Sequence, residues 1–445
     1  MRASRLNRPF QWFTVSVAEF LSRYMPWELA CTLAALVHAA LILNVIAVGA
    51  LFFIWLERKI AGRIQDRLGP TRVGGKFGWL QTLADGIKLL GKEDLMPGGA
   101  DGFLFKIAPY ISFCASFAAF IALPFAGGDM PFVAQHLNVA VFFVLAILGL
   151  EVFGVILAGY ASASKWSLFG AMREAAQVIS YEVPLGLCVV VPVLIAGTMD
   201  LVTIGDMQSG LFTNWFIFHD PFCFITFWVM FTCAMASVNR APFDLAEAES
   251  ELVAGFHTEY SGLRWSFFFM AEYGSMILVS ILASILFLGG WHGPFPIAEW
   301  SGLTTSEMFG ATYLANLLGM TNVLIKATVG VTLMIWVRWT FPRLRIDQVI
   351  TTCWKYCTPI VCFTFLGVLF WTYQGLPSLG DAMGTSKPLF SVHEVGSVHE
   401  ASAVPHEKPP VDSIARVFGS RAFGSRALTS QSFESRAPGS QEAGR

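Results

Sequence analysis

The sequence predicts an all-α polytopic membrane protein with about eight transmembrane helices and one interfacial amphipathic helix. Apolar residues make up 55% of the 445 residues and charged residues only 13%, unlike the composition of a soluble domain. The charges gather in a few short blocks and at both ends of the chain. Between these blocks lie uncharged runs that are long enough to cross a bilayer.

The same composition excludes several classes of protein. A formal net charge of −2 argues against a nucleic-acid binder that neutralises phosphates. Most of the eight cysteines lie in apolar runs, and none forms a Cys-x-x-Cys pair or a set with metal-ligand spacing. We therefore expect no metal or iron–sulfur site in this chain. Soluble-enzyme signatures are also missing, and Gly74-Gly75-Lys76 lacks the rest of a phosphate-binding loop.

Three regions follow from this pattern. Residues 1–30 carry aromatic side chains typical of a membrane interface and are predicted to form an N-terminal interfacial segment. Residues 31–375 form the eight-helix membrane domain. Residues 376–445 are rich in Ser, Gly, Ala, Pro and Arg and are predicted to be a disordered tail. The uncharged runs place the spans near 31–55, 107–124, 139–161, 176–196, 222–239, 266–289, 313–337 and 356–375.

One charged connection contains an amphipathic pattern, at about residues 77–92. Apolar residues recur there at spacings of three and four, opposite a polar face. The segment is too short and too charged to span, so it is predicted to lie along the membrane interface. A surface helix packed on protein fits the periodicity equally well. The apolar residues are Phe77, Leu80, Leu83, Ile87 and Leu90, and the polar ones are Gln81, Asp85, Lys88 and Lys92.

The distribution of Lys and Arg predicts the orientation. Four connections, 57–106, 161–175, 239–265 and 338–355, together hold seventeen basic residues, and the alternate connections hold none. The positive-inside rule therefore places the charged connections in the cytoplasm and both termini on the periplasmic side of a bacterial inner membrane.

Four ionisable residues lie within predicted spans, where an unpaired charge is costly. They are Glu151, Glu182, Glu272 and Lys326. Such groups face a polar cavity or one another, so we interpret them as part of a proton or ion path. The alternative is a set of neutralised carboxylates and a paired lysine that only hold helices together.

The connection 239–262 is strongly acidic but too apolar for a solvated loop. On a helix, Glu247 and Glu251 would share a face, and crowding of like charges would raise their pKa values. This segment is therefore expected to take up and release protons. Its acidic residues are Asp244, Glu247, Glu249, Glu251 and Glu259.

Several strings in the charged connections stand in a distinctive order. They are Glu57-Arg58-Lys59, Gln65-Asp66-Arg67-Leu68-Gly69-Pro70-Thr71-Arg72-Val73-Gly74, Leu80-Gln81, Asp85-Gly86-Ile87-Lys88-Leu89, Lys92-Glu93, Arg173 with Ala176-Gln177, Ser180-Tyr181-Glu182, Asn239-Arg240-Ala241-Pro242-Phe243-Asp244, and Pro342-Arg343-Leu344-Arg345 with Asp347-Gln348 and Trp354-Lys355. Over about residues 32–375, this set resembles the quinone-chamber membrane subunit of respiratory NADH:quinone oxidoreductase (complex I), known in bacteria as the H subunit.

The resemblance implies an eight-helix fold with quinone as the substrate. It also implies partners, namely soluble quinone-site and iron–sulfur subunits that hold flavin and iron–sulfur clusters, antiporter-like membrane subunits and membrane lipid. By motif, Arg58, Arg67, Arg72, Arg240 and Asp244 would belong to the quinone chamber. Glu182, Glu247, Glu249, Glu251, Glu259 and Glu272 would belong to a proton path, to which Glu151 and Lys326 are added by membrane placement only.

The chain departs from the family pattern at several positions. Ser237 stands where the family usually has a carboxylate, and Glu151 is the group we expect to replace it. Thr71, Ala163 and Ala246 are further departures. Two other interpretations stay open: the homologous membrane subunit of a proton-reducing hydrogenase, and an independent secondary transporter. The completeness of the motif set favours the complex I subunit, and the sequence shows no internal repeat of the kind that transporters carry.

Overall fold

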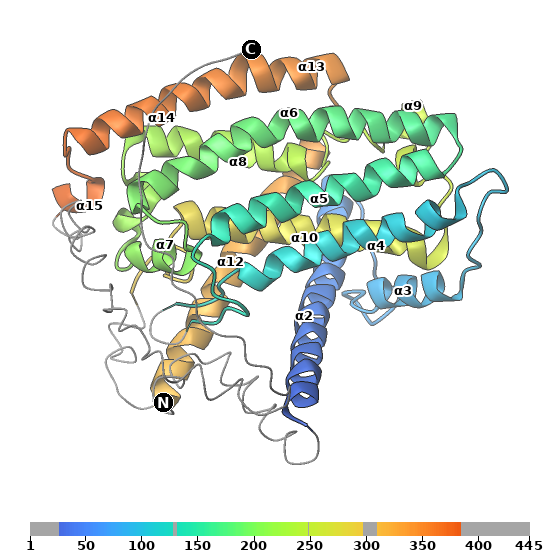
Figure 1. Ribbon diagram of the computed structural model, residues 1–445, viewed down its shortest axis with the longest axis horizontal. Helices are drawn as coiled ribbons and strands as arrows, with labels where there is room; N and C mark the ends of the chain where they lie inside the picture. The colour runs from blue at the N-terminus through green and yellow to red at the C-terminus, as the bar shows by residue number, and fades with distance from the viewer. Residues whose placement is uncertain (1–25, 128–130, 248, 297–308, 384–445) are drawn as a thin grey trace, which may run out of the picture. The chain divides into compact units, whose positions relative to one another are not determined.

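The computed structural model describes residues 26–127, 131–247, 249–296 and 309–383. These residues form helices and turns with no strand among them, which confirms the predicted all-α class (Figure 1). The helices are α2 (Trp27–Ile64), α3 (Gln81–Gly91), α4 (Gly102–Ala119), α5 (Ala140–Ala161), α6 (Lys165–Ala196), α7 (Leu201–Met207), α8 (Pro221–Ser237), α9 (Glu249–Leu252), α10 (Gly262–Phe287), α12 (Phe309–Thr340), α13 (Ile346–Thr351), α14 (Thr358–Tyr373) and α15 (Leu379–Ala382).

A helix stands at each of the eight predicted spans. Within the described residues, six helical segments are long and apolar enough to cross a membrane, and α8 is apolar but has only 17 residues. The eighth is α2, with 38 residues. The bounds predicted from uncharged runs were too narrow for α2, α6 and α12, because these helices continue through charged residues at their ends. The runs 222–239 and 356–375 were slightly longer than α8 and α14. The predicted interfacial segment 1–30 and the tail lie mostly outside the described residues.

Helix α10 occupies the centre of the helical packing. In its most apolar window 78% of the residues are buried, against 28% to 50% in the other candidate spans. It packs against α2, α4, α8 and α12, while α5 lies between α4 and α6. Figure 1 shows α4, α5, α6 and α10 running side by side. A polar residue on α10 is therefore surrounded by protein.

Aspartate side chains cap the N-termini of three helices. Asp101 accepts hydrogen bonds from the backbone N–H groups of Phe103 and Leu104 at the start of α4. Asp200 and Asp220 cap α7 and α8 in the same way. Each cap satisfies backbone donors that the first helical turn leaves free, so these acids have a structural role.

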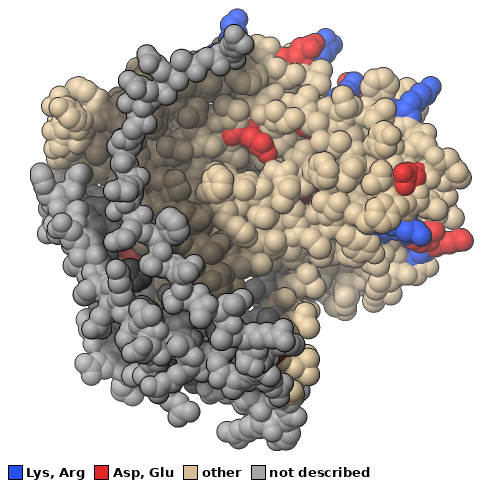
Figure 2. Space-filling model, viewed as in Figure 1, with Lys and Arg blue, Asp and Glu red and all other residues tan. Residues whose placement is uncertain are grey.

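The charged connections meet at one end of the helices. Arg264 at the start of α10 lies 2.7 Å from Asp94, which follows α3. Ser167 of α6 donates to Phe256 O at 2.7 Å, and the backbone N–H of Leu344 donates to Pro242 O at 3.0 Å. Figure 2 shows the charged side chains concentrated at the end where α3 and α9 lie, while the surface along the helices is largely uncharged. All four basic connections thus share one side.

The alternate connections meet at the opposite end. His136 Nε2 lies 3.2 Å from Asp200 Oδ2, and the backbone N–H of Val141 donates to Met199 O at 3.2 Å. The backbone N–H of Phe212 donates to Pro294 O at 3.2 Å. The two sets of connections are therefore separated by the length of the helices, about 33 Å for α5.

Helix α3 is shorter than the predicted segment 77–92, since residues 77–80 form turns. All five residues of its expected apolar face are exposed, from 48% for Leu83 to 67% for Leu90. On the polar face, Asp85 pairs with Arg58 of α2, while Lys88 and Lys92 are exposed. The arrangement leaves the apolar stripe uncovered by the described part of this chain.

Candidate functional site: a polar pocket and a buried row of carboxylates

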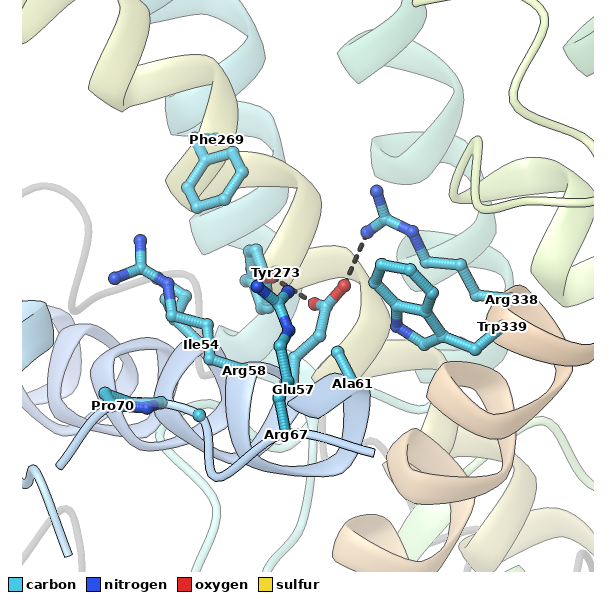
Figure 3. Close-up of a pocket in the computed structure, with 11 residues that line it drawn as sticks. Ile54, Glu57, Arg58, Ala61, Arg67, Pro70, Phe269, Tyr273, Arg338 and Trp339 are labelled. Atoms are coloured by element: carbon cyan, nitrogen blue, oxygen red, sulfur yellow. Dashed lines mark hydrogen bonds and ion pairs between the residues drawn. The ribbon is translucent and has the colours of Figure 1, made fainter. Parts of the chain in front are cut away.

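A pocket of about 420 Å³ opens between the ends of α2 and α12, the first half of α10 and the turn that follows α2. Its volume lies in the range of small-molecule sites. Figure 3 shows the polar side chains of Glu57, Arg58, Arg67 and Arg338 beside the rings of Phe269, Tyr273 and Trp339. The remaining lining residues are Ile54, Ala61, Gly69 and Pro70.

Glu57 is the buried anion of this pocket. Its carboxylate accepts a hydrogen bond from the Tyr273 hydroxyl and another from Arg338 Nη1 at 2.6 Å (Figure 3). Arg240 Nη1 lies 3.4 Å from the same carboxylate. The group is 6% exposed, so these partners compensate for the loss of water around its charge. In the sequence Glu57 stands out only as part of a motif, and it was not predicted as a site residue.

Arg240 connects the pocket to a second carboxylate. Its Nε lies 2.9 Å from Glu272 Oε1, and its guanidinium stands 4.5 Å from the centre of the Tyr273 ring. The side chain is almost fully buried, with 4% of its surface exposed. By its motif, Arg240 was expected to belong to the quinone chamber. Its side chain does not line this pocket, but lies behind Glu57 and joins it to Glu272.

Glu151 of α5 faces α10. It accepts a hydrogen bond from Ser275, whose hydroxyl lies 3.0 Å from that of Ser116 on α4. Glu272 lies one helical turn before Ser275 and interacts electrostatically with Glu151. Two of the carboxylates predicted from membrane placement thus lie together, inside the packing of α4, α5 and α10.

Glu174 was not predicted as a site residue. This residue of α6 is 2% exposed and accepts a hydrogen bond from Asn239 Nδ2 at 2.7 Å. Gln177 donates to Asn239 Oδ1 at 2.9 Å and to Ala236 O at 2.7 Å. Glu174, Gln177 and Tyr181 recur at helical spacing on one buried face of α6. The sequence shows this spacing, but the spacing alone does not indicate that the face is buried.

Two predicted path residues lie apart from this group. Glu182 is exposed on the side of α6. Its carboxyl group lies close to Gly149 of α5, where an added Cβ would be only 2.9 Å from the Glu182 Oε1 atom. Lys326 donates to the carbonyl oxygens of Leu288, Gly290 and His292 at 2.5, 2.9 and 2.6 Å. It therefore binds the end of α10, about 24 Å of helix rise from Glu272.

The acidic connection is not a continuous helix. Helix α9 begins at Glu249, so Glu247 and Glu251 do not share a helical face. Instead, Arg173 Nη1 lies 2.5 Å from Glu251 Oε2. The hydrogen bond and the positive charge of Arg173 lower the pKa of Glu251, so the expected increase through crowding was wrong for this residue. Glu247 Oε1 lies 3.4 Å from His257 Nδ1.

The rest of this connection is tightly folded. Gly255 has a φ of +59°, and a Cβ there would lie 1.6 Å from Ala246 O, so only glycine fits. Asp244 lies 3.0 Å from Arg343 and does not line the pocket. Glu259 is half-buried in the turn before α10. The Glu249 side chain lies outside the described residues.

The three arginines predicted after the first span have different positions. Arg58 and Arg67 line the pocket, whereas Arg72 lies exposed in the next turn and is absent from the lining. Arg58 also pairs with Asp85 of α3. Partial burial would raise the pKa of Asp85, but hydrogen bonds from Arg58 and Lys88 outweigh this effect and lower it. Helix α3 is thereby attached to the pocket wall.

No group of three or more His, Cys, Asp or Glu side chains with metal-binding geometry occurs among the residues that the structure describes. The fold and the site define a multi-pass membrane protein with a polar pocket near one end of its helices and buried carboxylates behind it.

Comparison with known proteins identifies the family. Residues 37–369 match the family described as NADH dehydrogenase, and the chain belongs to this family. It is 44% identical over 345 residues to the H subunit of an NADH-quinone oxidoreductase from Chlorobium luteolum, covering 76% of this chain and 89% of the relative. The corresponding H subunit from Chlorobaculum tepidum is 43% identical, with 76% and 92% covered. An H subunit numbered 2 from Cytophaga hutchinsonii is 42% identical over 354 residues, with 72% and 94% covered.

Proposed function

We propose that this chain is the membrane subunit of an NADH:quinone oxidoreductase in which the pocket beside Glu57 binds the quinone head group. The observation that carries the proposal is the combination of size and lining in this pocket. Aromatic and aliphatic side chains suit a ring and the start of an apolar tail. Arg58, Arg67 and Arg338 suit the ring oxygens, which accept hydrogen bonds and become more negative as electrons arrive.

The second part of the proposal is a proton path that begins at this pocket. Glu57, Arg240 and Glu272 form a continuous row of ion pairs from the pocket into the helical packing. Glu151 extends the row toward α5, and Glu247, Glu249, Glu251, Glu259 and Glu182 remain candidates on the acidic connection and α6. Buried carboxylates that interact with one another are suited to taking up and passing on protons.

The chain requires partners for this activity. Flavin and iron–sulfur clusters that carry electrons from NADH would be held by soluble subunits, and antiporter-like membrane subunits would continue the proton path. Exposed Glu182 lies on the side of a membrane-spanning helix, where lipid contact would be costly, which supports a covering subunit at α6. The basic connections would face the cytoplasm of a bacterial inner membrane, and lipid would surround the remaining apolar surface.

Narrowing the pocket tests the proposal. Ala61 is a small lining residue of α2, and Ala61→Leu adds volume to the pocket wall. In the purified complex we expect the KM for quinone to increase about fivefold or more, the effect of an overpacked contact. Reduction of an artificial acceptor at the flavin should be unchanged.

Ala39→Leu is the matched control, since Ala39 is exposed on the same helix and does not line the pocket. An unchanged KM in Ala61→Leu, in a complex of normal subunit composition, would reject the assignment of the pocket. The hydrogenase and transporter alternatives gain no support from the relatives, whose names describe NADH-quinone oxidoreductase subunits.

A further inference from the structure

Glu174 has an unusual environment for a buried carboxylate. One of its oxygens, Oε1, accepts the hydrogen bond from Asn239, and the other, Oε2, has no hydrogen-bond partner among the described residues. The neighbouring cation in the chain, Arg173, pairs with Glu251 instead. A buried carboxylate with one free oxygen and no cation bonded to it is in a costly state unless a proton reaches that oxygen.

The other carboxylates around Glu174 come from three different elements. Glu151 of α5, Glu247 of the acidic connection and Glu272 of α10 interact electrostatically with it. Glu272 belongs to the row that starts in the pocket, and Glu247 lies toward the end where the charged connections meet. Glu174 therefore interacts both with the buried carboxylates of α5 and α10 and with a carboxylate of the acidic connection.

Two amide side chains keep Glu174 in this position. Asn239 donates to its Oε1, and Asn239 is itself held by the amide of Gln177, one turn further along α6. Gln177 is fully buried and also donates to the end of α8 through Ala236 O. The free oxygen of Glu174 therefore does not result from a mobile side chain, because the opposite oxygen is fixed by a three-residue network.

We propose that Glu174 is a proton-transfer residue of this chain, which accepts a proton on Oε2 from the buried carboxylates and releases it toward the charged end, or the reverse. One proton is bound and one is released in each passage, so the carboxylate returns to its starting state. Gln177 and Asn239 act as positioning residues. This inference rests on the proposed proton path and adds to it a residue of α6 that neither the motifs nor membrane placement had indicated.

Ser237, where a carboxylate was expected, lies near the residue that binds Glu174. It lies two residues before Asn239, at the end of α8, and is the position where the resemblance implies a carboxylate. The sequence alone favours Glu151 as the replacement for that group. The hydrogen bond between Glu174 and Asn239 instead places a carboxylate of α6 next to this end of α8.

The test uses the whole purified complex, reconstituted in vesicles. Glu174→Gln keeps the size of the side chain and an oxygen that accepts from Asn239, but it cannot bind and release a proton. We expect coupled quinone reduction and proton pumping to fall by about tenfold or more. Glu174→Asp, which keeps the carboxyl group, should retain most of the activity. Glu28→Gln is the matched control, because Glu28 is exposed in the first turn of α2.

A second readout separates proton transfer from a structural role. Infrared difference spectra between the oxidised and reduced complex should contain a carboxyl band that is missing from Glu174→Gln. Wild-type turnover in Glu174→Gln would overturn the proposal, and so would reduced turnover with the carboxyl band retained. The KM of Ala61→Leu is independent of this result, so a failure of the pocket assignment is distinguishable from a failure at Glu174.

Discussion

Replacement of Arg240 by Met should destabilise the protein strongly, because this cation stands between two carboxylates. Its side chain is 4% exposed, and those of Glu57 and Glu272 are 8% and 15% exposed. After the substitution Glu57 keeps Arg338 and Tyr273, but Glu272 loses its ion pair. Removing one partner of a buried pair costs about 3–5 kcal/mol, which changes the ratio of folded to unfolded protein more than about a hundredfold.

Arg338→Met is the matched control for this experiment. Arg338 also pairs with Glu57, but its side chain is 30% exposed, so water compensates for part of the loss. We would measure the fraction of intact subunit by size-exclusion chromatography after heating in detergent. Arg240→Met should lose the folded form at a clearly lower temperature than Arg338→Met.

Adding Glu272→Gln to Arg240→Met removes the unpaired buried charge and should restore part of the stability. Equal thermal stability of Arg240→Met and Arg338→Met would refute the reasoning. A double variant no more stable than Arg240→Met would show that the cost does not come from the unpaired carboxylate of Glu272.

Three further predictions follow from other contacts. Arg173 lowers the pKa of Glu251, so the stability that this ion pair contributes is present above the ordinary carboxyl pKa of 4.5 and is lost as the pH falls through the lowered pKa. The thermal unfolding midpoints of the wild type and Arg173→Gln should therefore differ slightly at neutral pH and converge in acid. A difference that widens in acid would contradict this. Lys326→Met removes three hydrogen bonds at the end of α10 and should lower the free energy of unfolding by about 1–3 kcal/mol, measured by thermal unfolding. The KM for quinone should stay unchanged. A raised KM would link this end of α10 to the pocket. A cysteine in place of Gln135 should be labelled from the periplasmic side of intact cells and one in place of Arg345 should not, and the opposite pattern would reverse the proposed orientation.

Much of the helical architecture could be predicted from the sequence. Uncharged runs of sufficient length mark spans because a bilayer requires them, and a helix lies at each predicted run. The helix ends were less predictable. Helix α6 starts at Lys165, before the run begins, because backbone hydrogen bonding continues through Arg173 and Glu174 at the charged end of the molecule.

Site residues could be predicted where a charged residue type occurs within an apolar run. They could not be predicted where the packing of the helices determines which side chains they contact. Glu151 and Glu272 were found because a carboxylate within an apolar run needs an explanation. Glu174 was missed because it follows Arg173 in a charged stretch, and its burial depends on how α6 packs against the end of α8. The pairing of Glu251 with Arg173 likewise depends on how α9 lies against α6, and it reverses the expected effect on the pKa of Glu251.

The central position of α10 has a consequence for the biogenesis of the protein. This helix carries Glu272 and Ser275, and it is synthesised after α2, α4, α5, α6 and α8 but before α12. A newly inserted α10 surrounded by lipid would have no partner for the Glu272 carboxyl group, and the Ser275 hydroxyl could bond only to the backbone of its own helix. Ser116 of α4 and Arg240 after α8 are already part of the nascent chain and supply those partners. We therefore expect stable insertion of α10 to require prior assembly of the earlier helices, and a lesion in α4 or α8 to halt the maturation of the subunit at this step.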